Sequence, residues 1–200
     1  EGEDVYRAAR IEAAMRMLVL KHPLSFARAF LAARGRDRVK DAIFRMKDGV
    51  VAAIYQGVFS ALAHKYGVTI VAGSSVLPSP SVQDTELVVG GGELYNVSAV
   101  FKPNGSVYDV LTFKAFPTEE ELPFTARSRV ECLPVYDTPA GKLAILICAD
   151  SWYPAAYQVV GAKGAEIVVV LSYSSRDGLW AEPWLGYNGA PTRADVDVSD

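Results

Sequence analysis

The sequence has few of the residues that build disulfide frameworks and metal centres. Its 200 residues include only two cysteines, Cys132 and Cys148, and two histidines, His22 and His64. Each cysteine is expected in or beside an apolar strand, and two cysteines make neither a disulfide framework nor a zinc site. We therefore expect no metal, and a reducing, cytoplasmic setting fits this cysteine content best.

The chain also lacks the features of nucleic-acid-binding and membrane proteins. Its formal net charge is -3 at pH 7, whereas binding to phosphate backbones requires a clearly basic surface. No apolar run approaches the roughly 20 residues that span a bilayer, and no basic-then-apolar signal segment opens the chain. We therefore predict neither nucleic acid nor membrane as a partner. Residues 1–48 carry eleven Lys and Arg against seven Asp and Glu, which we interpret as a solvated helical face.

The sequence does contain enough apolar material for a substantial core. Half of its residues are hydrophobic and 10% are aromatic, which at this length predicts one folded domain. Apolar spacing predicts helices over residues 5–20 and 50–66, the second with Gly67 as its C-cap and an apolar stripe formed by Val51, Ile54, Val58, Leu62 and Tyr66. Residues 24–48 read as helical and basic but broken by Gly35, and they could form an insertion or a lid.

Several apolar segments alternate with turn signals and predict strands. They are residues 68–73, 94–101, 106–113, 130–137, 143–147 and 166–172. The turn Lys102-Pro103-Asn104-Gly105 joins two of these strands in a hairpin. Helix–strand units at both ends enclose the consecutive strands, which predicts an α/β layered domain with a mixed sheet.

The stretch LAILICADSWYP, residues 143–154, places Cys148 directly after a run that suits a strand covered on both faces. Asp150 and Ser151 are good helix N-caps, and Pro154 suits a first helical turn. Cys148 would then lie on a strand-to-helix elbow, where unpaired N–H groups and the helix dipole favour a thiolate. The pattern marks a candidate nucleophile, although an inert buried cysteine that ends a strand explains the segment equally well.

A nucleophilic cysteine needs a base and a group that stabilises negative charge. The hairpin exit FKAFPTEEELPF, residues 113–124, begins with Lys114 and could point a cation and a carboxylate into one pocket. An exposed lysine beside a solvated acidic loop is the alternative. A Cys–His mechanism also stays open, but it needs an imidazole beside the thiol. His22 and His64 both lie in segments predicted as helices, and neither is conveniently placed beside Cys148.

Four segments, in order over residues 50–175, resemble the carbon-nitrogen hydrolase (nitrilase/amidase) superfamily, whose hallmark is a catalytic Glu, Lys and Cys. ALAHKYGVTIVAG resembles a helix and strand of that family, LYNVSAVFKPNGSVYDVLTFK its hairpin, and LICADSWYP its cysteine elbow. KAFPTEEE matches its pattern of Lys, Pro-Thr and a Glu seven residues after the Lys. The resemblance implies a nitrilase-like α-β-β-α sandwich with mixed sheets, incomplete at both ends, and a homo-oligomer.

The resemblance also implies a reaction and a set of roles. Cys148 would attack the carbon of a small nitrile or amide, and water would hydrolyse the resulting thioimidate or thioester without any cofactor. Lys114 and the Ala149 N–H would stabilise the developing negative charge, and Glu121 would orient Lys114 or a proton carrier. The substrate pocket would be lined by two aromatic side chains, for which packing is an equally good account: Trp152 and Tyr153.

The chain departs from the family at the first catalytic Glu, because no strand-Pro-Glu stretch precedes the helix at 50–66. The nearest acids are Glu1, Glu3 and Glu12. We therefore expect the base upstream of Glu1 and read residues 1–200 as a single partial domain in which 1–48 is a helical basic insertion or link. A catalytically inactive binding or scaffolding domain is the alternative function.

Overall fold

Four helices precede the first strand in the computed structural model of the protein, which describes residues 10–173. They are α2 (Ile11–Lys21), α3 (Pro23–Ala32), α4 (Arg38–Arg45) and α5 (Asp48–Tyr66). Pro23 begins α3 because proline suits a first helical turn, and the Asp37 side chain caps α4 by accepting the Lys40 N–H at 3.0 Å. Gly67 ends α5 with a φ of 63°, which confirms the predicted C-cap.

The buried face of α5 differs from the predicted one. The stripe of Val51, Ile54, Val58, Leu62 and Tyr66 is exposed, with Ile54 61% accessible. The opposite side of the helix packs on the strands through four residues, Ala52, Tyr55, Phe59 and Ala63. Because α5 is apolar on both sides, its spacing predicts a helix but does not identify the side that enters the core.

In the described part of the chain, ten short strands form four sheets. They are β1 (Ile70–Val71), β2 (Ser75–Pro78), β3 (Ser81–Gln83), β4 (Glu86–Val88), β5 (Leu94–Ser98), β6 (Val100–Phe101), β7 (Thr112–Phe113), β8 (Val135–Thr138), β9 (Gly141–Ile147) and β10 (Ile167–Leu171). The pairs are antiparallel in β1–β6, β3–β4 and β2–β5–β7. In the remaining sheet β9 pairs antiparallel with β8 and parallel with β10, as the predicted mixed sheet requires.

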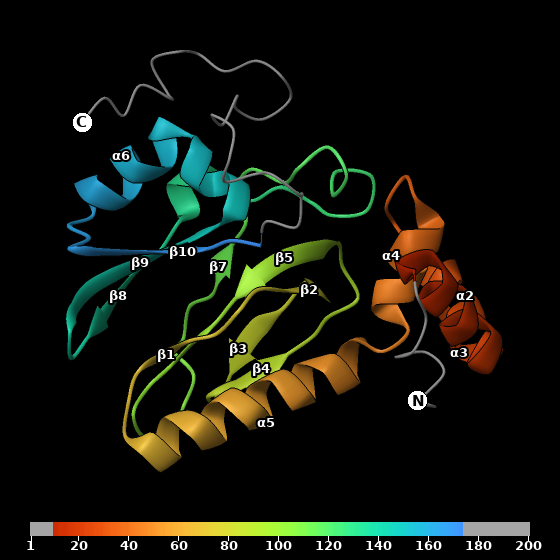
Figure 1. The fold of residues 1–200 in the computed structure, drawn as a ribbon, viewed down its shortest axis with the longest axis horizontal. Coiled ribbons are helices and arrows are strands. Elements are labelled where there is room, and N and C mark those ends of the chain that lie inside the picture. The colour runs from red at the N-terminus through yellow and green to blue at the C-terminus, as the bar shows by residue number, and fades with distance from the viewer. Residues whose placement is uncertain (1–9, 174–200) are drawn as a thin grey trace.

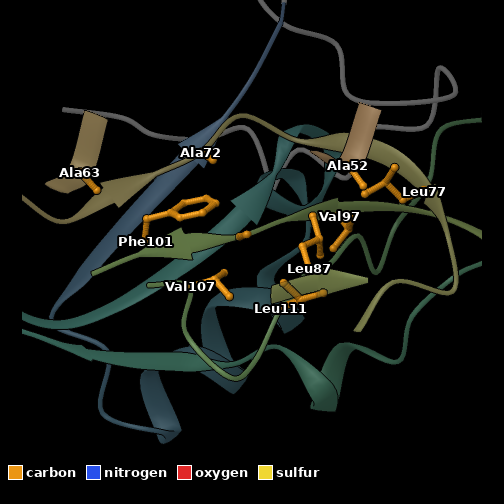
Figure 2. Close-up of a cluster of buried hydrophobic side chains, with 10 residues drawn as sticks. Ala52, Ala63, Ala72, Leu77, Leu87, Val97, Phe101, Val107 and Leu111 are labelled. Carbon is orange, nitrogen blue, oxygen red and sulfur yellow. The ribbon is translucent and has the colours of Figure 1, made fainter. Parts of the chain in front are cut away.

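The layers follow the order helix, sheet, sheet, helix. Figure 1 shows α5 along one side of the strands β1 to β7, and α6 (Pro154–Ala162) on the far side beyond β9 and β10. Under α5, side chains from β2, β4, β5 and β6 form the cluster drawn in Figure 2, with Phe101 fully buried. The α/β sandwich class predicted from the sequence is confirmed.

Strand β9 is buried on both faces, as its unbroken apolar run predicts. One face of β9 packs toward β6 through Leu143, Ile145 and Ile147, which lie in one cluster with Val100 and Tyr136. The alternate residues Ala144 and Leu146 pack beneath α6 with Ala156 and Val160. This two-sided burial fixes the position of the residue that follows the strand, Cys148.

The predicted strand over residues 130–137 is wrong in its first half. Residues Val130–Cys132 form a 3₁₀ helix, and Cys132 is exposed rather than part of an apolar strand. Lys163 Nζ donates to the carbonyl oxygens of Glu131 and Leu133 at 2.7 and 2.6 Å. Those two carbonyls therefore have a side-chain partner in place of a strand ladder.

The hairpin strands are also shorter than predicted, because the first arm breaks between β5 and β6. The second arm keeps only β7 and a single bridge from Val107 to Phe101. Within residues 10–173, no helix combines the length and apolar character needed to cross a membrane.

Candidate active site

Cys148 follows the last residue of β9 and begins a 3₁₀ helix, Cys148–Trp152. Its φ is 51°, in the left-handed region that a non-glycine residue rarely adopts. Such a conformation costs on the order of 1–3 kcal/mol and persists only where surrounding structure enforces it, typically at functional sites. The turn leaves the residue partly exposed at the end of a buried strand.

The predicted N-caps of the helix after Cys148, Asp150 and Ser151, are wrong, whereas Pro154 lies in the first turn of that helix as predicted. Helix α6 begins only at Pro154, with Tyr153 as its N-cap and no side-chain cap. Asp150 and Ser151 lie instead in the 3₁₀ turn, where Ser151 Oγ donates to the Cys148 carbonyl oxygen at 2.7 Å. The elements that pack against this turn are mainly β9, β10 and α6.

Asp150 binds the cysteine turn to the segment that follows Lys114. Its fully buried carboxylate accepts the Ile147 N–H at 3.1 Å within the turn. The same carboxylate accepts the N–H groups of Ala115 and Phe116 at 3.0 and 2.8 Å. Burial raises the pKa of Asp150, while these three donors and the charge of Lys114 oppose the rise. Asp150 therefore holds the two predicted catalytic segments side by side.

Lys114 and Glu121 form a largely buried ion pair. Lys114 Nζ lies 2.6 Å from Glu121 Oε2, and only 3% of the lysine side chain and 18% of the glutamate side chain are exposed. The Thr118 N–H donates to the same carboxylate oxygen at 2.7 Å, and Asn96 Nδ2 donates to Oε1 at 2.8 Å. The structure therefore brings Lys114 and Glu121 together, and it adds Asn96 from β5.

The electrostatics of Glu121 follow from these contacts. Desolvation is the largest single influence and raises its pKa, but the hydrogen bonds from Lys114, Thr118 and Asn96, together with the lysine charge, lower the pKa overall. Glu119 and Glu120 are exposed at the tip of the same loop. Of the three consecutive glutamates, Glu121 is the one that forms the ion pair with Lys114 described above.

Three further predicted residues follow the cysteine in the chain. Ala149 follows it directly and is fully buried. Tyr153 stacks on Phe116 with ring centroids 4.0 Å apart, so its ring packs the elbow against the segment after Lys114. Trp152 is the last residue of the 3₁₀ turn and is partly buried.

Ser172 was not predicted, although it lies beside the cysteine with its Oγ 3.9 Å from Cys148 Sγ. The strand pattern could have indicated it. Strands β9 and β10 are parallel and pair Ile147 with Leu171, so the residues that follow them meet at one edge of the sheet.

The other predicted candidates are placed as follows. His22 is the C-cap of α2, and His64 is exposed on α5 as expected. Glu1 and Glu3 lie outside the described residues, as does the side chain of Glu12. Residues 10–173 hold no group of three or more His, Cys, Asp or Glu side chains that could bind a metal ion.

Comparison with known proteins places this geometry in a family. The model of the carbon-nitrogen hydrolase family matches residues 52–190. The probable hydrolase YhcX of Bacillus subtilis is 31% identical over 114 residues, 57% of this chain and 20% of that protein. The citrullinase of Francisella tularensis is 30% identical over 116 residues, 56% of this chain and 36% of that protein.

A solved structure agrees with these sequence matches. The carbon-nitrogen hydrolase of Helicobacter pylori G27 aligns with a TM-score of 0.52 at 23% identity, over 79% of this chain and 52% of that one. The chain thus spans about a fifth to a third of the curated relatives and about half of the solved structure. Because the family model covers more than half of the sequence, the chain belongs to the carbon-nitrogen hydrolase family.

Proposed function

We propose that the protein hydrolyses a non-peptide carbon–nitrogen bond in a small nitrile or amide, with Cys148 as the covalent nucleophile. One observation carries the proposal. A partly exposed cysteine with a strained backbone is bound through Asp150 to the segment that begins with a buried, ion-paired lysine. A nucleophile beside a fixed cation is the arrangement that addition to a polarised carbon requires.

In the proposed reaction with an amide, the Cys148 thiolate adds to the carbonyl carbon and the oxygen gains the negative charge. Lys114 and the Ala149 N–H stabilise that oxygen. Collapse of the intermediate expels ammonia, once the nitrogen is protonated, and leaves a thioester. Water then attacks the thioester and releases a carboxylic acid and the free thiol. With a nitrile, addition of the thiolate places the negative charge on nitrogen, and protonation gives a thioimidate. One water then adds and ammonia leaves, which yields the same thioester for hydrolysis by a second water.

Glu121 fits the role of a positioning residue better than that of the first base. Both of its carboxylate oxygens already accept hydrogen bonds, from Asn96 on one side and from Lys114 and Thr118 on the other. A general base needs an oxygen free to accept the thiol proton. Glu121 would therefore hold the Lys114 side chain in place, and a different carboxylate would deprotonate Cys148.

Trapping of the covalent intermediate tests this proposal. The complete protein is incubated with a panel of small nitriles and amides, and intact-mass analysis looks for an adduct that peptide mapping assigns to Cys148. One relative is named a citrullinase, so the panel includes carbamoyl compounds. Cys148→Ala should form no adduct and release no ammonia. The absence of any adduct or turnover in the wild type would favour an inactive binding or scaffolding domain.

The proposal extends to a cytoplasmic homo-oligomer. Both cysteines are free, as a reducing compartment would keep them. Light scattering after size-exclusion chromatography measures the oligomeric state, and a monomer at micromolar concentration would contradict this part of the proposal.

A further inference from the structure

Helix α4 and the turn that joins it to α3 pack against the loop that carries Glu121. We call residues 117–125 the acidic loop. The Asp37 N–H donates to the Pro123 carbonyl oxygen at 2.8 Å, and the ring of Phe44 stacks on Phe124 with centroids 5.1 Å apart and planes within 4°. In Figure 1 the α2–α4 group lies beside this loop rather than over the main sheets.

The turn between α3 and α4 approaches the acidic loop so closely that only glycine fits. A Cβ on Gly35 would lie 2.8 Å from the Pro123 oxygen and 2.9 Å from the Phe124 Cα. Both atoms belong to the backbone, so no side-chain rotation could relieve the clash. Two stretches separated by almost ninety residues are thus in direct backbone contact.

A buried ion pair gives this turn a fixed shape. The Asp41 carboxylate is 1% exposed, and its Oδ2 accepts the N–H groups of Arg34 and Gly35 at 3.0 and 2.8 Å. Its Oδ1 accepts Nε of Arg45, whose side chain is 5% exposed. Removing either partner would leave an uncompensated buried charge, so the pair keeps the turn in one conformation.

The contacted residues Pro123 and Phe124 follow Glu121 closely in the chain, and Phe124 is hydrogen-bonded to it. The Phe124 and Thr125 N–H groups donate to the Glu121 carbonyl oxygen at 3.0 and 2.8 Å, and Thr125 Oγ1 donates to it at 3.0 Å. Residues 121–125 therefore form one hydrogen-bonded turn. A surface that fixes Pro123 and Phe124 also fixes the backbone of Glu121.

We propose that the segment from α3 to α4 positions Glu121 against Lys114, with Gly35, Asp41 and Phe44 as the positioning residues. The inference rests on the proposed function, because it gives this segment a task in that reaction. A surface loop alone is mobile, whereas a catalytic ion pair must be held within about 0.5 Å. The segment supplies this rigidity from outside the sandwich, which distinguishes it from a lid that covers the substrate.

Phe44→Ala tests the inference because it removes the stacked ring and leaves the ion pair of the turn intact. Phe26→Ala is the matched control, since Phe26 packs on Phe30 within α3, with centroids 5.9 Å apart, and not on the acidic loop. Hydrogen exchange should be at least tenfold faster for the peptide spanning residues 114–126 in Phe44→Ala than in Phe26→Ala. Phe44→Leu should restore part of the protection.

Kinetics supply a second readout, which a purely structural role would not change. Lys114 is the charged group that lowers the pKa of Glu121. A loosened loop weakens that contact and moves the pKa back toward its ordinary value. The acid limb of kcat/KM should therefore shift to higher pH in Phe44→Ala, and kcat should fall about tenfold with KM nearly unchanged.

The outcomes separate the two proposals. Equal exchange and equal pH profiles in Phe44→Ala and Phe26→Ala would overturn the positioning role even in an active enzyme. If the wild type forms no Cys148 adduct, the proposed function fails, and the exchange data alone still decide whether the segment fixes the loop. Gly35→Ala should give the same faster exchange as Phe44→Ala, and unchanged exchange in both variants would overturn the inference.

Discussion

Asp150→Asn is the substitution that most directly tests how the cysteine turn is held. The Asp150 carboxylate accepts three backbone N–H groups, two from the segment after Lys114 and one from Ile147. An asparagine oxygen in the Oδ1 position keeps the bonds to Ala115 and Phe116, but its NH₂ group then faces the Ile147 N–H. The opposite rotamer keeps the single bond and sets the NH₂ group against two donors.

The better rotamer therefore loses one charge-assisted hydrogen bond and gains a contact between two donors. Loss of one such bond costs about 1.5–3 kcal/mol of the free energy of unfolding. Asp150→Ala leaves three N–H groups without this acceptor, at about 1–3 kcal/mol each. That total approaches the whole stability of a typical domain, about 5–15 kcal/mol. We expect the asparagine variant to fold and the alanine variant to express poorly.

Urea denaturation followed by tryptophan fluorescence measures the difference, and the rate of Cys148 adduct formation measures the functional loss. Asp37→Asn is the control, because the Asp37 side chain accepts the Lys40 N–H in a helix cap, where asparagine caps equally well, and otherwise forms only a long ion pair with Lys40 Nζ at 3.7 Å. Surface substitutions usually change the free energy of unfolding by less than about 0.5 kcal/mol. A change as small as this in Asp150→Asn would refute the idea that Asp150 holds the two segments together.

Three further predictions concern the catalytic groups. Cys148→Ala should abolish turnover with the fold intact, whereas Cys132→Ala should be silent because Cys132 is exposed in a 3₁₀ helix; ammonia release and circular dichroism distinguish the two. Lys114→Met should lower kcat about 100-fold or more, the loss seen for one oxyanion donor, and a smaller loss would contradict its role. Glu121→Gln should slow turnover while Glu120→Gln does not. The pKa of Glu121 is lowered from its ordinary value of 4.5, so the ionised carboxylate stabilises the fold at pH values above 4.5. This contribution disappears as the pH falls through the lowered pKa. The wild type should therefore lose stability in acid more steeply than Glu121→Gln, as urea denaturation at a series of pH values would measure.

The parts of the fold that were predictable depend on local signals. The apolar run before Cys148 predicts a strand buried on both faces, and β9 is such a strand. Gly67 predicts the end of α5 because a left-handed residue is required there. In both cases the residues that carry the signal are also the residues that adopt the structure.

Orientation was less predictable because it depends on partners distant in the sequence. The exposed stripe of α5, which includes Val58 and Leu62, has the same spacing as its buried side, which includes Phe59 and Ala63. Contacts with the strands determine which side of α5 is buried, because Phe59 packs against Phe101 with ring centroids 5.9 Å apart. Helical periodicity contains no information about that fit.

Asp150 shows the same limit within the candidate active site. Its position before Pro154 suggests an N-cap, because a short acidic side chain next to a helix start usually has that role. Its carboxylate instead binds N–H groups 34 and 35 residues earlier in the chain. Only the folded hairpin brings those donors within reach, so the local pattern predicted a helix cap and assigned Asp150 the wrong partners.

The strained backbone of Cys148 and the three bonds of Asp150 belong together. A residue with φ of 51° returns to a relaxed conformation unless its neighbours prevent it. Ile147, directly before the cysteine, donates to Asp150, and Ser151, directly after Asp150, donates to the Cys148 carbonyl. These bonds close a small ring around the cysteine and can offset the cost of its conformation. The same carboxylate then fixes the segment after Lys114 against this ring, so the Asp150 side chain contributes both to the strained turn and to the alignment of the two segments.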